Sequence, residues 1–149
     1  MGFKVAAISR GKDKEAFAKK LGAHVYVDAD KGDPAAQLTA LGGARVILST
    51  APSGKAMTPL FNGLGYHGEL ITVGGSMEPV EVSPIQLITL GRAVRGWASG
   101  SPIDSEEALN FCALTGVRAM IETFPLEKAN EALERVLSNK VRFRAVLVH

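Results

Sequence analysis

The stretch from Phe3 to Lys12 constrains the fold of this chain more than any other. Its first six residues, FKVAAI, are almost continuously apolar, and a polar turn, SRGK, follows them. A short strand without polar alternation is typical of a parallel sheet that is covered on both faces. A helical pattern over Lys12–Leu21 comes directly after the turn. Because open α/β folds bind ligands at the carboxyl ends of their strands, Ser9 and Arg10 mark a candidate site.

The composition is that of an ordinary globular chain and argues against several classes of protein. Of the 149 residues, 46% are hydrophobic and 21% are charged, and the formal net charge is +2. This length makes one domain the default. Lysines and arginines are scattered rather than gathered in a stripe, which argues against a nucleic-acid interface, and no apolar run approaches the ~18 residues of a membrane span. The single cysteine, Cys112, excludes an internal disulfide and favours a reducing compartment, so we expect a cytoplasmic protein.

Strands and helices alternate along the whole chain. The predicted strands are Phe3–Ser9, Val25–Val27, Arg45–Ser49, Glu69–Val73, Ala93–Ala98, Ala119–Thr123 and Phe143–Val148, with Val80–Val82 as a short edge piece. The predicted helices cover residues 12–21, 34–41, 53–64, 84–90 and 127–139. Asp33 and Ser53 are the expected N-caps of the second and third helices, and Asp104 or Ser105 caps a further helix. The alternation indicates stacked βαβ units in a Rossmann-like, doubly wound α/β fold.

The residue types that most often carry out reactions form no recognisable motif here. Cys112 lies on the apolar face of a predicted helix, where a role in the core is the simpler interpretation. His24, His67 and His149 lack partners at the spacings that zinc sites use. An exposed or capping histidine is the simpler interpretation for each. We therefore predict no catalytic residue and no metal ligand in this chain.

The turn after the first strand carries the strongest indication of binding. Residues Ser9–Lys14 bring a hydroxyl, cations and the start of a helix together. Unpaired backbone N–H groups at a helix start and an arginine both favour phosphate, although an ordinary solvated loop has a similar composition. In a dinucleotide-binding fold, an acidic residue here bonds the 2′-hydroxyl of NAD, whereas arginine accommodates the 2′-phosphate of NADP. Ser9 followed by Arg10, with no carboxylate before Asp13, predicts a preference for NADP, with NAD as the alternative.

Four segments carry a resemblance to a known family. They are SRGKDK with KKLGAH (residues 9–14 and 19–24), LITVGG (70–75), PLEKANEAL (125–133) and RFRAVLV (142–148). In this order and spacing they resemble motifs of the coenzyme-binding domain of medium-chain, zinc-containing alcohol dehydrogenases. The matching family motifs are a strand with an "LGA" turn, a strand ending in "VG", a "PLEEINEAL" helix and a closing "GRxVL" strand. Each motif alone is weak, but the four together span nearly the whole chain.

The resemblance implies a nicotinamide cofactor and gives roles to matched positions. The family's ribose-reading position falls on Ser9, and Lys14 matches a lysine near that ribose. Thr50 and Ala51 would flank the adenine. The residues implied on the nicotinamide side, largely through backbone groups, are Val73, Gly74, Gly96 and Ala98. Arg144 matches an arginine that reaches the pyrophosphate, although a surface arginine on a strand is the alternative.

The resemblance also implies parts that this sequence lacks. The fingerprint Gly-x-Gly-x-x-Gly precedes the ribose-reading position by about 20 residues, and Ser9 has only eight residues before it. We therefore expect residues 1–149 to be a partial dinucleotide-binding domain, without its first strand, glycine-rich turn and first helix. The family's zinc-bearing catalytic domain is also absent, so we expect the chain alone to be inactive.

The absent strand is the central one in the sheet order 3-2-1-4-5-6. Its loss would leave unpaired backbone groups on the two strands that flank it, Phe3–Ser9 and Arg45–Ser49. Three solutions are open: the two halves pair directly, another chain donates a strand, or residues outside this sequence fill the place. We favour the last.

Two functions are consistent with the sequence. The first is the coenzyme-binding part of an NADP(H)-dependent alcohol or aldehyde oxidoreductase. The second is a non-enzymatic Rossmann-like remnant that acts as a dimerisation module. Ala93–Ala98 is the last strand of the expected order, and only Arg95 discourages edge pairing. We therefore expect a two-fold homodimer through this strand, with a loop that covers the edge as the alternative.

Overall fold

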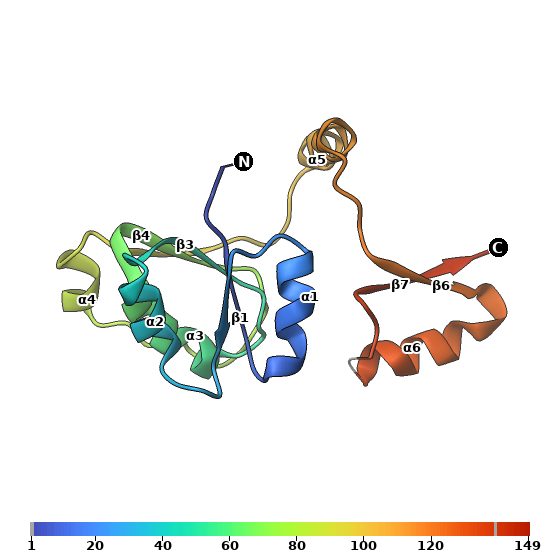
Figure 1. The fold of residues 1–149 in the computed structure, drawn as a ribbon. Helices are drawn as coiled ribbons and strands as arrows, with labels where there is room; N and C mark the ends of the chain where they lie inside the picture. The colour runs from blue at the N-terminus through green and yellow to red at the C-terminus, as the bar shows by residue number, and fades with distance from the viewer. Residues whose placement is uncertain (1, 139) are drawn as a thin grey trace. The chain divides into compact units, whose positions relative to one another are not determined.

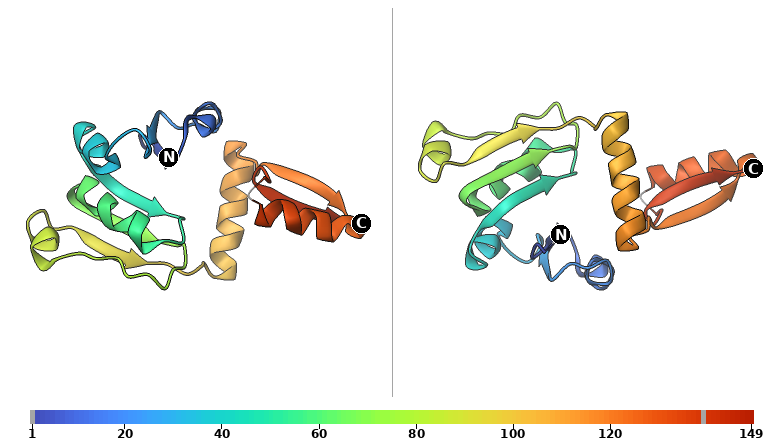
Figure 2. Two further views of the ribbon diagram at one scale, coloured as in Figure 1. Left: turned by 90° about the horizontal axis from the view of Figure 1, so that it is seen from below. Right: turned by 90° about the horizontal axis from the view of Figure 1, so that it is seen from above.

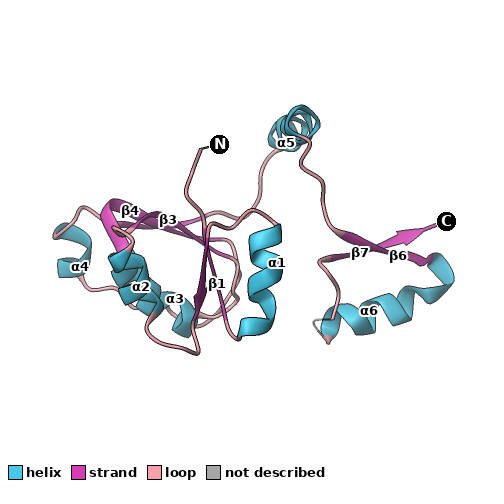
Figure 3. Cartoon of the chain, in the orientation of Figure 1, coloured by secondary structure: helices cyan, strands magenta, loops and turns pink. Residues whose placement is uncertain are grey.

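The computed structural model describes residues 2–138 and 140–149, and the chain divides into two compact units, residues 1–99 and 100–149. Figure 1 shows the course of the chain within each unit, and Figure 3 marks its helices and strands. All strand pairings among the described residues are parallel, as the alternation of strands and helices predicts. The assignment of both units to one dinucleotide-binding domain stays a prediction.

The first unit alternates strands with short helices. Its elements are β1 (Ala6–Ser9), η1 (Lys12–Lys14), α1 (Glu15–Lys20), β2 (Val25–Asp28), α2 (Pro34–Ala40), β3 (Ala44–Ser49), α3 (Gly54–Leu60), η2 (Phe61–Gly63), β4 (Leu64–Thr72), α4 (Pro84–Ile88) and β5 (Ala93–Gly96). The first strand begins three residues later than predicted. The fourth begins five residues earlier, because Leu64 already pairs with Ala44 before the register shifts.

The strand order of the first unit confirms the Rossmann-like, doubly wound fold. β1 pairs with β2, and β3, β4 and β5 form a second ladder with β4 in the middle. In the order 3-2-1-4-5-6, strand 1 is the one that this chain lacks. β2 and β1 then correspond to strands 3 and 2, and β3, β4 and β5 correspond to strands 4, 5 and 6. Among the described residues β1 and β3 do not pair with each other, so the solution in which the two halves join directly is wrong here.

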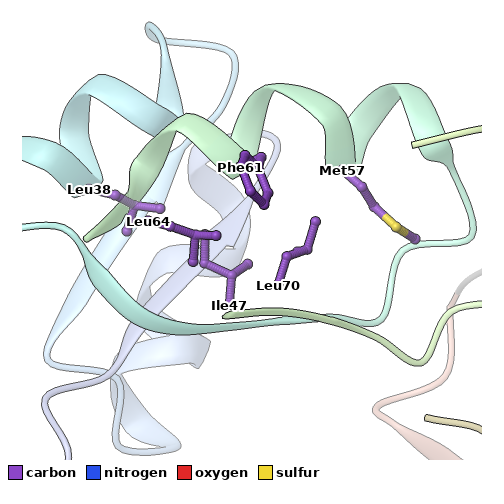
Figure 4. Close-up of a cluster of buried hydrophobic side chains, with 6 residues drawn as sticks. All are labelled: Leu38, Ile47, Met57, Phe61, Leu64 and Leu70. Atoms are coloured by element: carbon purple, nitrogen blue, oxygen red, sulfur yellow. The ribbon is translucent and has the colours of Figure 1, made fainter. Parts of the chain in front are cut away.

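A compact apolar core holds helices α2 and α3 against one face of the three-stranded ladder. Its six buried side chains are Leu38 from α2, Met57 from α3, Phe61 from η2, Ile47 from β3, and Leu64 and Leu70 from β4 (Figure 4). Full burial of a side chain of this size contributes roughly 1.5–3 kcal/mol. Ala6 and Ile8 of β1 pack against the same cluster, so the core joins both ladders into one unit.

Two predicted strands differ in the structure. Val80–Val82 forms no strand, so that prediction is wrong. Val80 and Val82 instead lie half-buried against the core, which explains their apolar character. The strand predicted over Ala93–Ala98 ends at Gly96, and the two residues after it leave the regular ladder.

The second unit combines two parallel strands with two longer helices. Its elements are α5 (Pro102–Thr115), β6 (Ile121–Pro125), η3 (Leu126–Lys128), α6 (Ala129–Leu137) and β7 (Arg144–Val148). α6 lies along the β6–β7 ladder (Figure 2), where Arg135 Nη2 donates to Glu122 Oε2 at 2.7 Å. β6 begins two residues later than predicted. Asn139, the predicted end of the last helix, lies outside the described residues.

Helix caps follow the sequence at two of three positions. Asp33 and Ser53 cap α2 and α3 through hydrogen bonds from backbone N–H groups, as predicted. The cap of α5 is neither Asp104 nor Ser105. It is Ser101, because Ser101 and Asp104 bond each other's backbone N–H groups in a capping box. None of the helices in the described residues is long and apolar enough to cross a lipid bilayer.

Candidate functional site

The turn after β1 is held in place by two side chains of β2. The Gly11 N–H donates to Asp28 Oδ1 at 2.9 Å, and the Tyr26 hydroxyl donates to the Gly11 carbonyl at 2.6 Å. Gly11 has φ 79° and ψ 155°, a conformation that residues with a side chain rarely adopt. Ser9 and Asp28 are register partners at the ends of the two strands. The structure therefore places Asp28 beside Ser9, although Asp28 lies on the next strand and not in the turn.

Cations of the turn are open to solvent. Arg10, Lys12 and Lys14 are all exposed. An open surface hollow of about 290 Å³ is lined by Lys12, Glu15, Ala16 and Lys19. Glu15 is paired with Lys19 at 2.7 Å, and the hydrogen bond from Lys19 lowers the pKa of Glu15. The exposed cations fit the prediction that this turn meets an anion.

The carboxyl ends of β3 and β4 meet closely. The N–H groups of Val73 and Gly74 both donate to the Ser49 carbonyl, at 3.0 and 3.1 Å. A Cβ on Gly74 would lie 2.7 Å from the Thr50 carbonyl oxygen and 2.6 Å from that of Ala51. Real Cβ atoms do not come this close, so the position requires glycine. The structure thus brings four of the predicted site residues together at one sheet edge.

β5 continues the same edge with small residues. Gly96 is the register partner of Thr72, and the Trp97 N–H donates to the Thr72 carbonyl at 3.0 Å. A Cβ on Gly96 would approach Thr72 Oγ1 at 3.8 Å and meet nothing closer. Ala98 is exposed beyond the end of the strand. The assignment of Gly96 and Ala98 to the nicotinamide side stays a prediction.

Arg144 belongs to the second unit. It is the exposed first residue of β7 and the register partner of Ile121. On the neighbouring residue of β6, Glu122 accepts the Arg142 N–H at 2.8 Å and a hydrogen bond from Arg135 at 2.7 Å. These two bonds lower the pKa of Glu122. Arg144 itself forms no ion pair among the described residues.

The described residues do not fit a metal site. Among them, no group of three or more His, Cys, Asp or Glu side chains could hold an ion. His24 Nδ1 accepts the Val5 N–H at 3.1 Å, and the ring of His67 lies against that of Tyr66, 4.1 Å between centroids. These contacts explain two of the histidines structurally. We therefore derive no catalytic step through zinc from this chain.

Sequence reasoning missed Tyr26, Asp28 and Glu78. Glu78 Oε2 accepts the Ser53 hydroxyl at 2.9 Å and the Lys55 N–H at 3.3 Å, at the start of α3. One signal could have found Asp28. It ends the strand that follows Ser9 in the chain, and adjacent parallel strands bring their carboxyl ends to one edge.

Comparison with known proteins decides the family. Residues 1–114 match the family of zinc-binding dehydrogenases. The chain belongs to this family. It is 46% identical over 147 residues to alcohol dehydrogenase notN of Aspergillus sp. (strain MF297-2), covering 99% of this chain and 43% of that protein. It is also 46% identical over 149 residues to alcohol dehydrogenase patD of Penicillium expansum, covering 98% and 43%. The chain thus spans less than half the length of these two curated relatives.

Solved structures agree with the family. A cinnamyl alcohol dehydrogenase of Sorghum bicolor matches 98% of this chain and 41% of its own, with a TM-score of 0.82 and 32% identity. The alcohol dehydrogenase of Aeropyrum pernix matches 98% and 43%, with a TM-score of 0.83 and 30% identity. These likenesses confirm the resemblance to the coenzyme-binding domain of medium-chain, zinc-containing alcohol dehydrogenases. The preference for NADP, the dimer and the cytoplasmic location stay predictions.

Proposed function

We propose that this chain is the coenzyme-binding part of an NADP(H)-dependent alcohol dehydrogenase that interconverts alcohols and aldehydes. The end of β1 carries the proposal. Ser9 stands where a carboxylate would bond the 2′-hydroxyl of NAD, and the exposed Arg10 follows it. The alcohol dehydrogenases of Aspergillus sp. and P. expansum, each 46% identical to the chain, support the activity.

The chain's own residues bind and orient the coenzyme in this proposal. When bound, NADP accepts or supplies the hydride. Ser9, Arg10 and Lys14 meet the 2′-phosphate and its ribose. The remaining contacts are Thr50 and Ala51 at the adenine, Val73, Gly74, Gly96 and Ala98 at the nicotinamide side, and Arg144 at the pyrophosphate. Gly74 approaches Thr50 and Ala51 closely. This approach supports the adenine and nicotinamide assignments, because it brings residues of both to one edge of the sheet.

The substitution Ser9→Asp tests the proposal in a full-length dehydrogenase that contains this chain. A carboxylate at this position repels the 2′-phosphate and bonds the 2′-hydroxyl. The ratio of kcat/KM for NADP to that for NAD should fall at least about tenfold, which corresponds to ~1.4 kcal/mol. Ser105→Asp adds the same charge at an exposed serine of α5 that is assigned to no coenzyme contact and should leave the ratio unchanged. An unchanged ratio in Ser9→Asp would refute the assignment.

A dimer through β5 is the second part of the proposal. β5 pairs with β4 on one side and is the edge of its ladder among the described residues. Arg95 lies 3.3 Å from Glu69 of β4, so the one charge on this strand is paired within the sheet. The exposed side chains of Val94 and Trp97 flank it. These features favour antiparallel pairing of two copies about a two-fold axis. The same edge would serve a non-enzymatic dimerisation module.

A further inference from the structure

Both polar backbone groups of Gly11 are occupied by side chains of β2. Its N–H donates to Asp28 and its carbonyl accepts from Tyr26, at 2.9 and 2.6 Å. Asp28 Oδ1 also accepts the Asp30 N–H at 3.1 Å, and the Ala29 N–H donates to the Ser9 carbonyl at 2.9 Å. The turn is therefore anchored on its neighbouring strand and is not a free surface loop.

This anchoring limits which groups of the turn can meet a ligand. Because Asp28 takes the Gly11 N–H, that amide is not available to bind a phosphate. The conformation of Gly11 also sets the direction in which the chain leaves Arg10, since a φ of 79° turns the backbone away from the strand. The Ser9 hydroxyl and the exposed side chains of Arg10 and Lys14 then remain to recognise a substituent on the ribose.

We propose that Tyr26 and Asp28 are positioning residues that set the selectivity of this site for the 2′-phosphate. They act through Gly11, because their two hydrogen bonds hold the backbone of the turn that carries Ser9 and Arg10. This inference rests on the proposed function, because it concerns the same ribose site. Neither residue is expected to touch the coenzyme.

The charge of Asp28 and its hydrogen bond can be separated. Asp28→Asn keeps an oxygen that accepts the Gly11 N–H and removes the negative charge, whereas Asp28→Ala removes both. Tyr26→Phe removes the other anchor without a change of charge. Matched controls are Asp30→Asn, and Tyr66→Phe, whose hydroxyl makes no hydrogen bond among the described residues. A positioning role predicts that the asparagine variant keeps the selectivity and that the alanine and phenylalanine variants lose it.

The experiment titrates a full-length dehydrogenase that contains this chain with 2′,5′-ADP and with 5′-AMP, which differ by the 2′-phosphate, and measures each Kd by calorimetry. The selectivity is the Kd for 5′-AMP divided by the Kd for 2′,5′-ADP, so a larger ratio means a stronger preference for the 2′-phosphate. Loss of one hydrogen bond of ordinary strength should lower this ratio about threefold to tenfold in Tyr26→Phe and Asp28→Ala. Asp28→Asn and both controls should keep it at or above the wild-type value. Exchange of the Arg10–Lys12 amides should quicken in the two disruptive variants.

The outcomes separate the inference from the proposed function. A wild-type dehydrogenase that binds neither probe, or binds both equally, overturns the NADP preference and with it the role of the anchor. A wild-type dehydrogenase that discriminates, beside folded Tyr26→Phe and Asp28→Ala variants with the same ratio, overturns the anchor alone. Should Asp28→Ala fail to fold, Tyr26→Phe and Asp28→Asn still decide the question.

Discussion

Ser9 shows how far single residues can be interpreted from sequence. Its place at the end of a short apolar strand, and the arginine after it, were enough to predict a position at the carboxyl edge of a parallel sheet, and the structure has Ser9 there. The hydrogen bonds of Tyr26 and Asp28 to Gly11 could not be predicted in the same way. They depend on the register between β1 and β2, and register is a property of the folded pair rather than of either strand.

Glu122 links the stability of the second unit to pH. The hydrogen bond from the Arg142 N–H, followed by that from Arg135, lowers its folded-state pKa below the ordinary value of 4.5. The stabilisation from this carboxylate is therefore fully present above its unfolded-state pKa. It is lost as the pH falls below about 4.5 and through the lowered folded-state pKa.

Glu122→Gln should make the stability of the second unit depend less on pH in the acid range. The free energy that protects the β6–β7 amides from exchange, measured from pH 7 to pH 3, should fall less steeply in this variant below about pH 4.5. Glu127→Gln, at an exposed position of η3, serves as control and should follow the wild-type curve. Parallel wild-type and Glu122→Gln curves would show that the carboxylate does not contribute in this way.

At the scale of elements, the sequence predicts helix starts better than strand ends. Asp33 and Ser53 precede clear apolar helical patterns, and both are caps in the structure. Ser101 was missed because Asp104 and Ser105 are also good caps; the capping box and a proline at the next position decide for Ser101. Val80 and Val82 are apolar and β-branched, which is typical of a strand, but packing of both side chains against the core explains their character equally well.

The start of α3 carries a stability prediction. Ser53 Oγ accepts the Ala56 N–H and donates to Glu78, which ties the loop after β4 to the helix. Ser53→Ala removes the cap and should lower the free energy of unfolding of the first unit by about 1 kcal/mol. Urea denaturation followed by circular dichroism measures this change. Ser99→Ala, at an exposed position, should change it by less than about 0.5 kcal/mol; equal effects of the two substitutions would contradict the cap.

At the scale of the whole molecule, the order of strands was predictable and the division into units was not. Alternating buried strands and helices, together with the position of Ser9, predicted parallel ladders flanking an absent central strand, and β2-β1 and β3-β4-β5 have that order. The boundary between Ser99 and Gly100 lies in the short stretch SGSP (residues 99–102), whose composition is typical of any loop and does not by itself mark a division between units. It follows from which residues share a core, and a local pattern does not contain that information.

The dimer is testable at one backbone amide. The Trp97 N–H points to β4, and N–H groups alternate in direction along a strand, so the Val94 N–H points to the open edge. Val94→Pro removes this donor without removing a bond to β4, and it should yield monomers in light scattering. Val94→Ala keeps the N–H and should remain dimeric. Dimers of a folded Val94→Pro variant would rule out this interface.

The most direct test of the account is the structure of a full-length dehydrogenase containing this chain, crystallised with NADP. We expect the 2′-phosphate at the carboxyl end of β1, within hydrogen-bond distance of Ser9 Oγ and the Arg10 guanidinium, with the nicotinamide at the edge formed by Gly74 and Gly96. A 2′-phosphate that contacts neither Ser9 nor Arg10 would contradict the assignment of this turn as the site that distinguishes NADP from NAD.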